Sequence, residues 1–151
     1  MSRKKGEERS KNYNKQLKKI NRIHRHIAHQ RSDHLQKLST EIANQYGIVC
    51  VETLNIQAMS NKDFGNGKAT LDNGYGLFLK MLEYKLEDRG TYFIKVDQWY
   101  PSSQICNNCG RRHKMALSER TYKCSCDYTC DRDLNAAKNI LDEGLRMYKS
   151  S

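Results

Sequence analysis

Two closely spaced pairs of cysteines near the C-terminal end of the chain constrain its fold more than any other feature. The cysteines of the first pair are separated by two residues and those of the second pair by one: Cys106, Cys109, Cys124 and Cys126. Four thiolates brought together across a short loop form the ligand set of a tetrahedral zinc site. Because such a site has no open position, we expect a structural zinc that contributes folding free energy to a segment poor in apolar residues.

The residues around these cysteines refine the prediction. Gly110 fits a knuckle, in which a residue at positive φ lets backbone N–H groups approach the sulfur atoms. Asp127 stands where the second knuckle would need a glycine, which predicts a less regular turn there. Cys130 and His113 are interpreted as bystanders, with a fifth metal ligand as the alternative role for Cys130. Cys50 is interpreted as a core residue.

The charge of the chain favours a polyanionic partner. Its 151 residues include 27 Lys and Arg against 17 Asp and Glu, a formal net charge of +10. Residues 1–46 hold 12 of these cations, only 4 of the acids, and four of the five histidines. Lys and Arg bind nucleic acids by neutralising phosphates, although a solvated Lys-rich helix is the simpler alternative. Further cations surround the cysteines, on a surface that either contacts phosphate or is idle: Arg111, Arg112, Lys114, Arg120 and Lys123.

Hydrophobic patterning argues against a membrane protein. The chain has no apolar run of about 18 residues and no signal-peptide pattern. The Cys-x-x-Cys spacing favours metal thiolates in a reducing compartment over disulfides, which predicts a cytoplasmic location and no membrane partner.

Periodicity predicts alternating helices and strands. Apolar residues at helical spacing indicate one long basic helix, or two with a break near Ser32. An unbroken β-branched run then predicts a central strand covered on both faces, and the order of the elements predicts an α/β sheet with crossover connections. The expected elements are a helix at 13–46, a strand at 48–51, a loop at 53–67, a helix at 69–88, a strand at 91–96 and a helix at 133–148.

Three acidic residues occupy positions that suit a magnesium site. Glu52 ends the first strand, whereas Asp131 and Asp133 open the last helix. Two-metal cleavage of phosphodiesters requires several carboxylates that converge on Mg²⁺. The alternatives are a solvent-facing strand end for Glu52, an N-cap for Asp131, and a favourable interaction of Asp133 with the helix N-terminus.

Residues 48–56, 100–110 and 131–140 together resemble the C-terminal half of the TnpB (OrfB) proteins of insertion sequences. These are transposon-encoded, RNA-guided DNA nucleases related to type V CRISPR effectors. The resemblance implies a RuvC-like, RNase H-type α/β nuclease fold with a zinc ribbon inserted before the last helix. It also implies DNA and guide RNA as partners. The family's active site uses three acids, of which the second matches Glu52 and the third matches Asp133, as ligands of catalytic Mg²⁺.

The same resemblance makes Asp131 a helix cap and Arg132 a supporting residue. The family's first acid, which lies in a Gly-Ile-Asp-Leu-Gly-like strand, has no counterpart, since the acids before Glu52 lie in helical or polar sequence: Glu7, Glu8, Asp33 and Glu41. We therefore expect a partial RuvC-like fold, marginally folded outside the zinc module. The Mg²⁺-dependent DNA endonuclease would be incomplete and inactive alone, unless a missing N-terminal half completes it in trans.

The predicted division is a basic helical segment at 1–46, a first part of the RuvC-like core at 47–103, a zinc ribbon at 104–126 and the final core helix at 127–151. Two other hypotheses remain open. One is a non-catalytic zinc-ribbon protein that binds nucleic acid. The other is a zinc-ribbon interaction module of the transcription or translation machinery, in which Glu52 and Asp133 would have no role.

Overall fold

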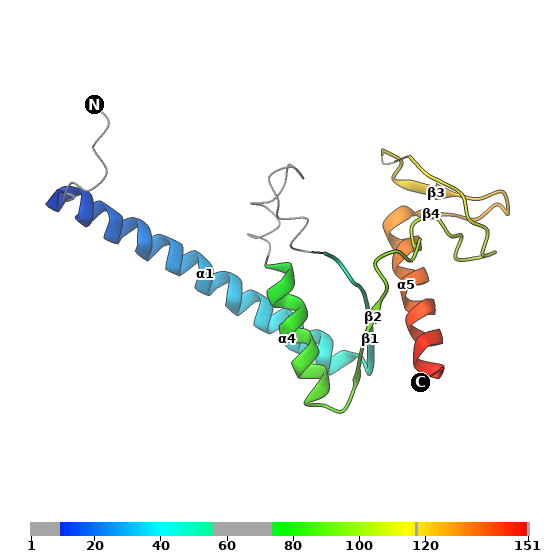
Figure 1. The fold of residues 1–151 in the computed structure, drawn as a ribbon, viewed down its shortest axis with the longest axis horizontal. Coiled ribbons are helices and arrows are strands. Elements are labelled where there is room, and N and C mark those ends of the chain that lie inside the picture. The colour runs from blue at the N-terminus through cyan, green and yellow to red at the C-terminus, as the bar shows by residue number, and fades with distance from the viewer. Residues whose placement is uncertain (1–9, 56–73, 117, 151) are drawn as a thin grey trace.

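The computed structural model describes residues 10–55, 74–116 and 118–150. Its parallel strands β1 (Ile48–Glu52) and β2 (Tyr92–Val96) lie between helices α4 and α5 (Figure 1). The predicted crossover is confirmed, because α4 connects the two parallel strands. The remaining elements are α1 (Lys11–Gln45), α4 (Tyr75–Glu87), the antiparallel hairpin of β3 (Thr121–Lys123) and β4 (Thr129–Asp131), and α5 (Arg132–Lys149). Residues 69–73 of the predicted second helix and 56–67 of the predicted loop lie outside the described residues.

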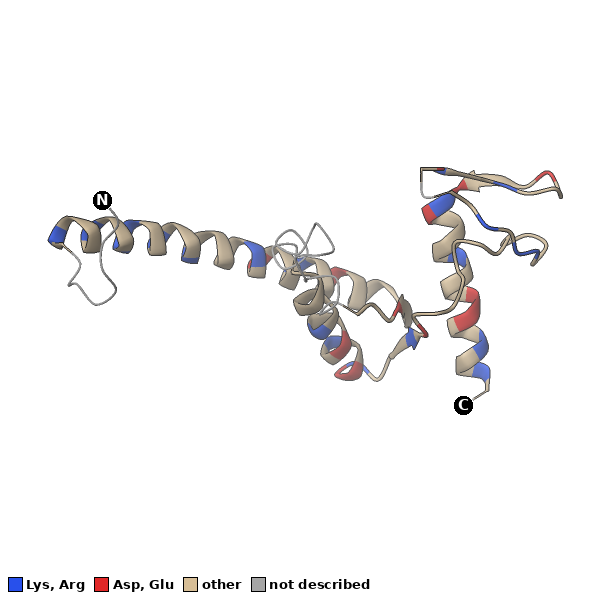
Figure 2. Cartoon of the chain, turned by 45° about the horizontal axis from the view of Figure 1, so that its top comes forward, with Lys and Arg blue, Asp and Glu red and all other residues tan. Residues whose placement is uncertain are grey.

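Helix α1 is continuous through Ser32, so the alternative of two helices is wrong. Its three buried residues, Leu35, Ser39 and Ala43, recur every four positions in its C-terminal third. The N-terminal part of α1 therefore projects from the rest of the molecule, and Lys and Arg residues occur along it (Figures 1 and 2). None of the helices in the described part of the chain is long and apolar enough to cross a membrane.

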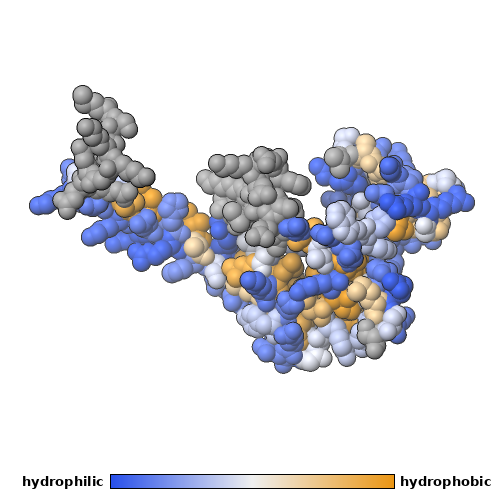
Figure 3. All heavy atoms as spheres, in the orientation of Figure 1, coloured by the Kyte–Doolittle hydropathy of each residue, from blue (hydrophilic) through white to orange (hydrophobic). Residues whose placement is uncertain are grey.

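The main apolar core lies where α1, α4 and one face of the sheet meet. At the surface, hydrophobic residues are visible over the region of α4 and the strands (Figure 3). Its buried members are Ala43, Leu82 and Leu86, and Val49 and Phe93 pack against them from the two strands. Leu82 and Leu86 belong to the apolar face that helical spacing predicts for the helix at 69–88, whereas the spacing in residues 13–46 did not single out Ala43.

Lys85 is a buried cation at the contact between α4 and α1, with 7% of its surface exposed. Its Nζ donates hydrogen bonds of 2.8 Å each to the Gln36 carbonyl, Ser39 Oγ and Thr40 Oγ1. An ammonium group has three donors, so all of them have acceptors and the burial is compensated. The sequence pattern gave no sign of this contact.

The second face of the sheet is covered by α5. A Cβ at Gly144 would lie only 2.3 Å from Cys50 Sγ, so the glycine allows the helix to approach β1 closely. Both faces of β1 are thus packed, as predicted. The predicted central position is not seen, because within the described ranges this sheet has two strands and every residue of β1 is only half-buried.

We expect Gly144→Ala to destabilise the protein by about 1–3 kcal/mol, because the added methyl group overpacks the contact with Cys50. Gly47→Ala is the matched control, since a Cβ there meets no atom within 4 Å. Urea unfolding of the zinc-loaded protein measures both variants. Adding Cys50→Ala to Gly144→Ala should recover part of the loss, and equal stability of the two single variants would contradict the close approach.

Candidate functional site

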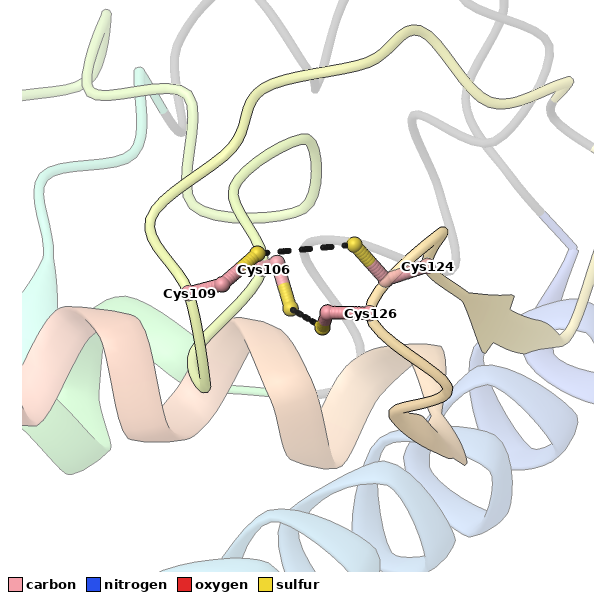
Figure 4. A group of neighbouring side chains, drawn as sticks. All are labelled: Cys106, Cys109, Cys124 and Cys126. Atoms are coloured by element: carbon pink, nitrogen blue, oxygen red, sulfur yellow. Dashed lines mark hydrogen bonds between the residues drawn. The ribbon is translucent and has the colours of Figure 1, made fainter.

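The four predicted cysteine ligands lie together, with their sulfur atoms facing one another (Figure 4). All four sulfurs lie within 4.8 Å of one another, and the Cys106–Cys126 and Cys109–Cys124 distances are 3.7 and 3.6 Å. Sulfur atoms bound at about 2.3 Å around a tetrahedral zinc ion are about 3.8 Å apart. The cluster therefore has the ligand type and the size that such an ion requires.

Two similar turns present these cysteines. Gly110 has a φ of +73°, and its N–H donates to the Cys106 carbonyl at 2.8 Å. Asp127 has a φ of +64°, and its N–H donates to the Cys124 carbonyl at 3.1 Å. Aspartate is among the non-glycine residues that enter this left-handed region most readily. The second turn therefore differs from the first in length but not in handedness. The less regular turn that Asp127 predicted is thus only a small departure from the first knuckle.

Hydrogen bonds favour a thiolate within the cluster. The pKa of Cys126 is lowered to about 6, mainly by a hydrogen bond from the backbone N–H of Tyr128 and secondly by one from the side-chain amide of Asn108. The Asn108 Nδ2 atom lies 3.7 Å from Cys126 Sγ. The Arg111 N–H lowers the pKa of Cys109, but desolvation and the other three thiols outweigh it and raise this pKa to about 12. One negative charge at Cys126 is thus favoured near neutral pH, and a cation would favour ionisation of the others.

The two predicted bystanders lie apart from this cluster. His113 Nδ1 is 3.2 Å from the hydroxyl of Tyr122, a fully buried residue of β3. Cys130 lies in β4, opposite Tyr122 in the hairpin. His113 therefore contacts the β3–β4 hairpin, and Cys130 is part of it.

Two buried asparagines of α5 attach the first cysteine turn to the helix. Asn135 and Asn139 are 0% and 3% exposed. The Asn135 side chain donates to the Ile105 carbonyl at 2.7 Å and accepts from the Asn107 N–H at 3.1 Å. Asn139 donates to the carbonyls of Ser102 and Ile105 at 2.8 and 2.7 Å. Sequence reasoning missed this role, although two asparagines four positions apart on an amphipathic helix were a visible signal.

The predicted acids Glu52 and Asp133 line one cleft of about 600 Å³. Glu52 comes from the end of β1, and Asp133 from the first turn of α5. The side chains of Arg112, Arg132 and Trp99 line the same cleft. The fold thus brings together two carboxylates that are distant in the sequence, and adds two cations and an aromatic ring.

The two carboxylates differ in their surroundings. Burial raises the pKa of Glu52. Burial also raises the pKa of Tyr75, and the nearby negative charge of Glu52 raises it further. The Asp133 side chain is 77% exposed, with Arg132 Nε 3.7 Å from its Oδ1. A cation bound between the acids would offset the cost of ionising Glu52 and would find Asp133 accessible from solvent.

Asp131 is the N-cap of α5, as predicted. Its Oδ1 accepts from the backbone N–H groups of Asp133 and Leu134 at 2.9 and 3.0 Å. These bonds satisfy donors of the first helical turn. The aspartate two positions further on is therefore the one that faces the cleft.

Comparison with known proteins identifies the family. The family model OrfB_IS605, described as "Probable transposase", matches residues 1–63, and the model "Cas12f1-like, TNB domain" matches residues 75–140. A Streptomyces pristinaespiralis protein named "Putative RNA-guided DNA endonuclease" is 38% identical over 140 residues, which are 90% of this chain and 34% of that protein. The Escherichia coli protein "Putative RNA-guided DNA endonuclease InsQ" is 32% identical over 89% of this chain and 37% of its own length.

A solved structure has a similar fold. The Cas12f1 chain in a cryo-electron microscopy structure with sgRNA and target DNA matches 85% of this chain and 40% of its own, with a TM-score of 0.59 and 24% identity. These matches define the class as transposon-associated proteins related in fold to Cas12f1. The chain belongs to the TnpB/OrfB family. It spans about a third of the length of the curated relatives that it matches.

Proposed function

We propose that this chain is the C-terminal part of an RNA-guided DNA endonuclease and that its carboxylate cleft is part of a RuvC-like cleavage centre. The observation that carries the proposal is the common cleft of Glu52 and Asp133, which come from a strand end and a helix start. The names of the relatives supply the substrate class, target DNA selected by a guide RNA.

In this proposal Glu52 and Asp133 hold Mg²⁺, for which carboxylate oxygens are preferred ligands. When bound, Mg²⁺ would stabilise the charge that develops on the phosphate and activate the attacking water. Arg112 and Arg132 line the cleft from the ribbon and from α5 and are placed to contact the DNA backbone.

We assign zinc to the four-cysteine cluster, in a structural role. The sulfur–sulfur distances fit the ion, and four protein ligands leave no position for a substrate. Asn135 and Asn139 connect this centre to the helix that carries Asp133. Zinc would thereby hold the loop that lines the cleft in place against α5.

The catalytic centre is proposed to need a third carboxylate from another polypeptide segment, in keeping with the three acids of the family. Within the described residues, Asp33 and Glu41 precede Glu52, but both lie on α1, and the Asp33 carboxylate pairs with Lys37 at 2.6 Å. Two carboxylates hold a pair of metal ions less well than three do. Acting alone, these 151 residues are therefore expected to bind nucleic acid without cleaving it.

Complementation of the chain tests this proposal. We expect no Mg²⁺-dependent DNA cleavage by the chain alone, and cleavage when the N-terminal two thirds of a relative and a guide RNA are added. Glu52→Gln or Asp133→Asn should then lower the cleavage rate by more than about 100-fold, since loss of even an outer-shell partner costs 10- to 100-fold. Asp131→Asn is the matched control, because asparagine caps a helix as well as aspartate does.

Cleavage by the chain alone would contradict the proposed incompleteness. Full activity of both acid variants would contradict the assignment of the centre. It would favour the non-catalytic alternative, which is supported by the cation-rich, exposed part of α1. That alternative expects salt-dependent nucleic-acid binding unchanged by either substitution. The interaction-module hypothesis is disfavoured, because it gives no reason for the two acids to share a cleft.

A further inference from the structure

Trp99 is the chain's single tryptophan and the most exposed large hydrophobic side chain in the described part of the molecule, at 81%. It lines the same cleft as Glu52 and Asp133. An indole ring presents a large apolar face on which a planar ligand can stack, and this ring lies at the cleft of the two acids rather than on an open surface. The position of the ring therefore raises the question of which ligand stacks on it.

The backbone beneath this ring is well held. The Trp99 N–H donates to Asp97 Oδ1 at 2.7 Å, and the Tyr100 N–H donates to the Asp97 carbonyl at 3.1 Å. This turn directly follows β2, whose last residue, Val96, pairs with Glu52. The ring is thus presented from a fixed turn at the sheet edge that carries a candidate metal ligand.

The other side chains of the cleft indicate the chemistry of the ligand. Arg112 is oriented by a hydrogen bond of 3.0 Å from its Nε to Gln104 Oε1. Arg132 supplies a second guanidinium group, with 18% of its side chain exposed. Cations that contact a phosphate backbone beside an aromatic face that stacks on bases are the combination found in sites for single-stranded nucleic acid.

We propose that Trp99 is a positioning residue that stacks on an unpaired base and thereby places the adjoining phosphate at Glu52 and Asp133. This inference rests on the proposed nuclease function and deepens it, because it assigns to one side chain of the cleft the recognition of an unpaired base beside the phosphate held at Glu52 and Asp133. The bases of a duplex are stacked on one another and offer no free face to the indole, whereas every unpaired base does.

Because Trp99 is the chain's only tryptophan, its fluorescence reports on this contact directly. The experiment titrates the zinc-loaded chain with labelled oligothymidylate and with a blunt duplex of the same length. Tryptophan emission measures stacking, and the anisotropy of the label measures total binding. We expect the single strand to quench the emission strongly and the duplex to leave it nearly unchanged, although both bind through phosphate contacts.

Variants separate stacking from structure. Trp99→Ala should weaken single-strand binding roughly 5- to 150-fold, which is the cost of losing one base–aromatic stack, and should leave duplex binding unchanged. Trp99→Phe should restore most of the affinity, because phenylalanine keeps an aromatic face. The zinc content and far-ultraviolet circular dichroism of the variants should equal those of the parent, since the ring is exposed.

The outcomes distinguish this inference from the proposed function. Single-strand binding that leaves the emission unchanged and is unaffected by Trp99→Ala would overturn the inference alone, and would indicate that the ring covers a protein surface. A chain that binds neither DNA would contradict both. Cleavage in the complemented enzyme that is lost in Asp133→Asn but unchanged in Trp99→Ala would keep the nuclease centre and reject the role of Trp99.

Discussion

Removing the metal from the four-cysteine cluster is expected to unfold residues 104–131 and to have little effect on the α1–α4 core, whose buried residues lie outside this segment. The only buried hydrophobic residues described in this segment are Cys106 and Tyr122, so it has little apolar surface to hold it together. Structural zinc sites have apparent binding free energies of about 10–16 kcal/mol, comparable to the whole stability of a domain. Treatment with a chelator, or Cys106→Ser, should therefore abolish the β3–β4 hairpin.

Zinc analysis and amide hydrogen exchange check this expectation. The parent should contain one zinc ion per chain, and Cys106→Ser should lose most of its affinity for zinc together with the protection of the hairpin amides. Cys130→Ser is the matched control, because Cys130 lies in the hairpin but outside the cluster. Unchanged hairpin protection in the chelated parent would show that the segment folds without metal.

The sequence was sufficient to predict the cluster of four cysteines because the constraint is local. Two short turns fix the spacing within each pair of cysteines, and only one hairpin must close to bring the pairs together. The cap at Asp131 could be predicted for the same reason, since an N-cap bonds to N–H groups two and three residues further along the chain.

Features that depend on packing between distant elements were not predictable from the pattern. The buried Lys85 satisfies its donors on a helix that lies more than 40 positions away. The sulfur of Cys50 on β1 leaves no room for a side chain at Gly144, and no periodicity indicates that contact. The partner of each of these residues is set by how the helices pack, which hydrophobic patterning describes only as an apolar face.

The carboxylate cleft is an intermediate case. The sequence predicted that Glu52 ends a strand and that Asp133 starts a helix, but it did not give the distance between these two elements. The structure brings them together through the packing of α5 on the sheet and through the turn that carries Trp99. Their roles as magnesium ligands stay a prediction that the complementation experiment tests.

Asn139→Ala is expected to destabilise the ribbon–helix contact by about 2–4 kcal/mol. Asn139 is 3% exposed, and its amide donates to the carbonyls of Ser102 and Ile105. The Ile105 carbonyl keeps its bond from Asn135, but the Ser102 carbonyl loses the side-chain donor it has in the folded protein. An unsatisfied buried carbonyl costs about 1–3 kcal/mol, and the lost side-chain volume adds a cavity.

Thermal unfolding of the zinc-loaded protein measures this loss. Asn139→Leu keeps the side-chain volume but removes the donor, so it should recover little stability if the hydrogen bonds dominate and much of it if the cavity does. Leu141→Ala, at a side chain that is 45% exposed on the same helix, should change stability by less than about 0.5 kcal/mol.

Because Ser102 and Asp133 line the same cleft, Asn139→Ala should also lower cleavage by the complemented enzyme while zinc stays bound. Wild-type stability and activity in this variant would show that the asparagine contacts do not position the cleft.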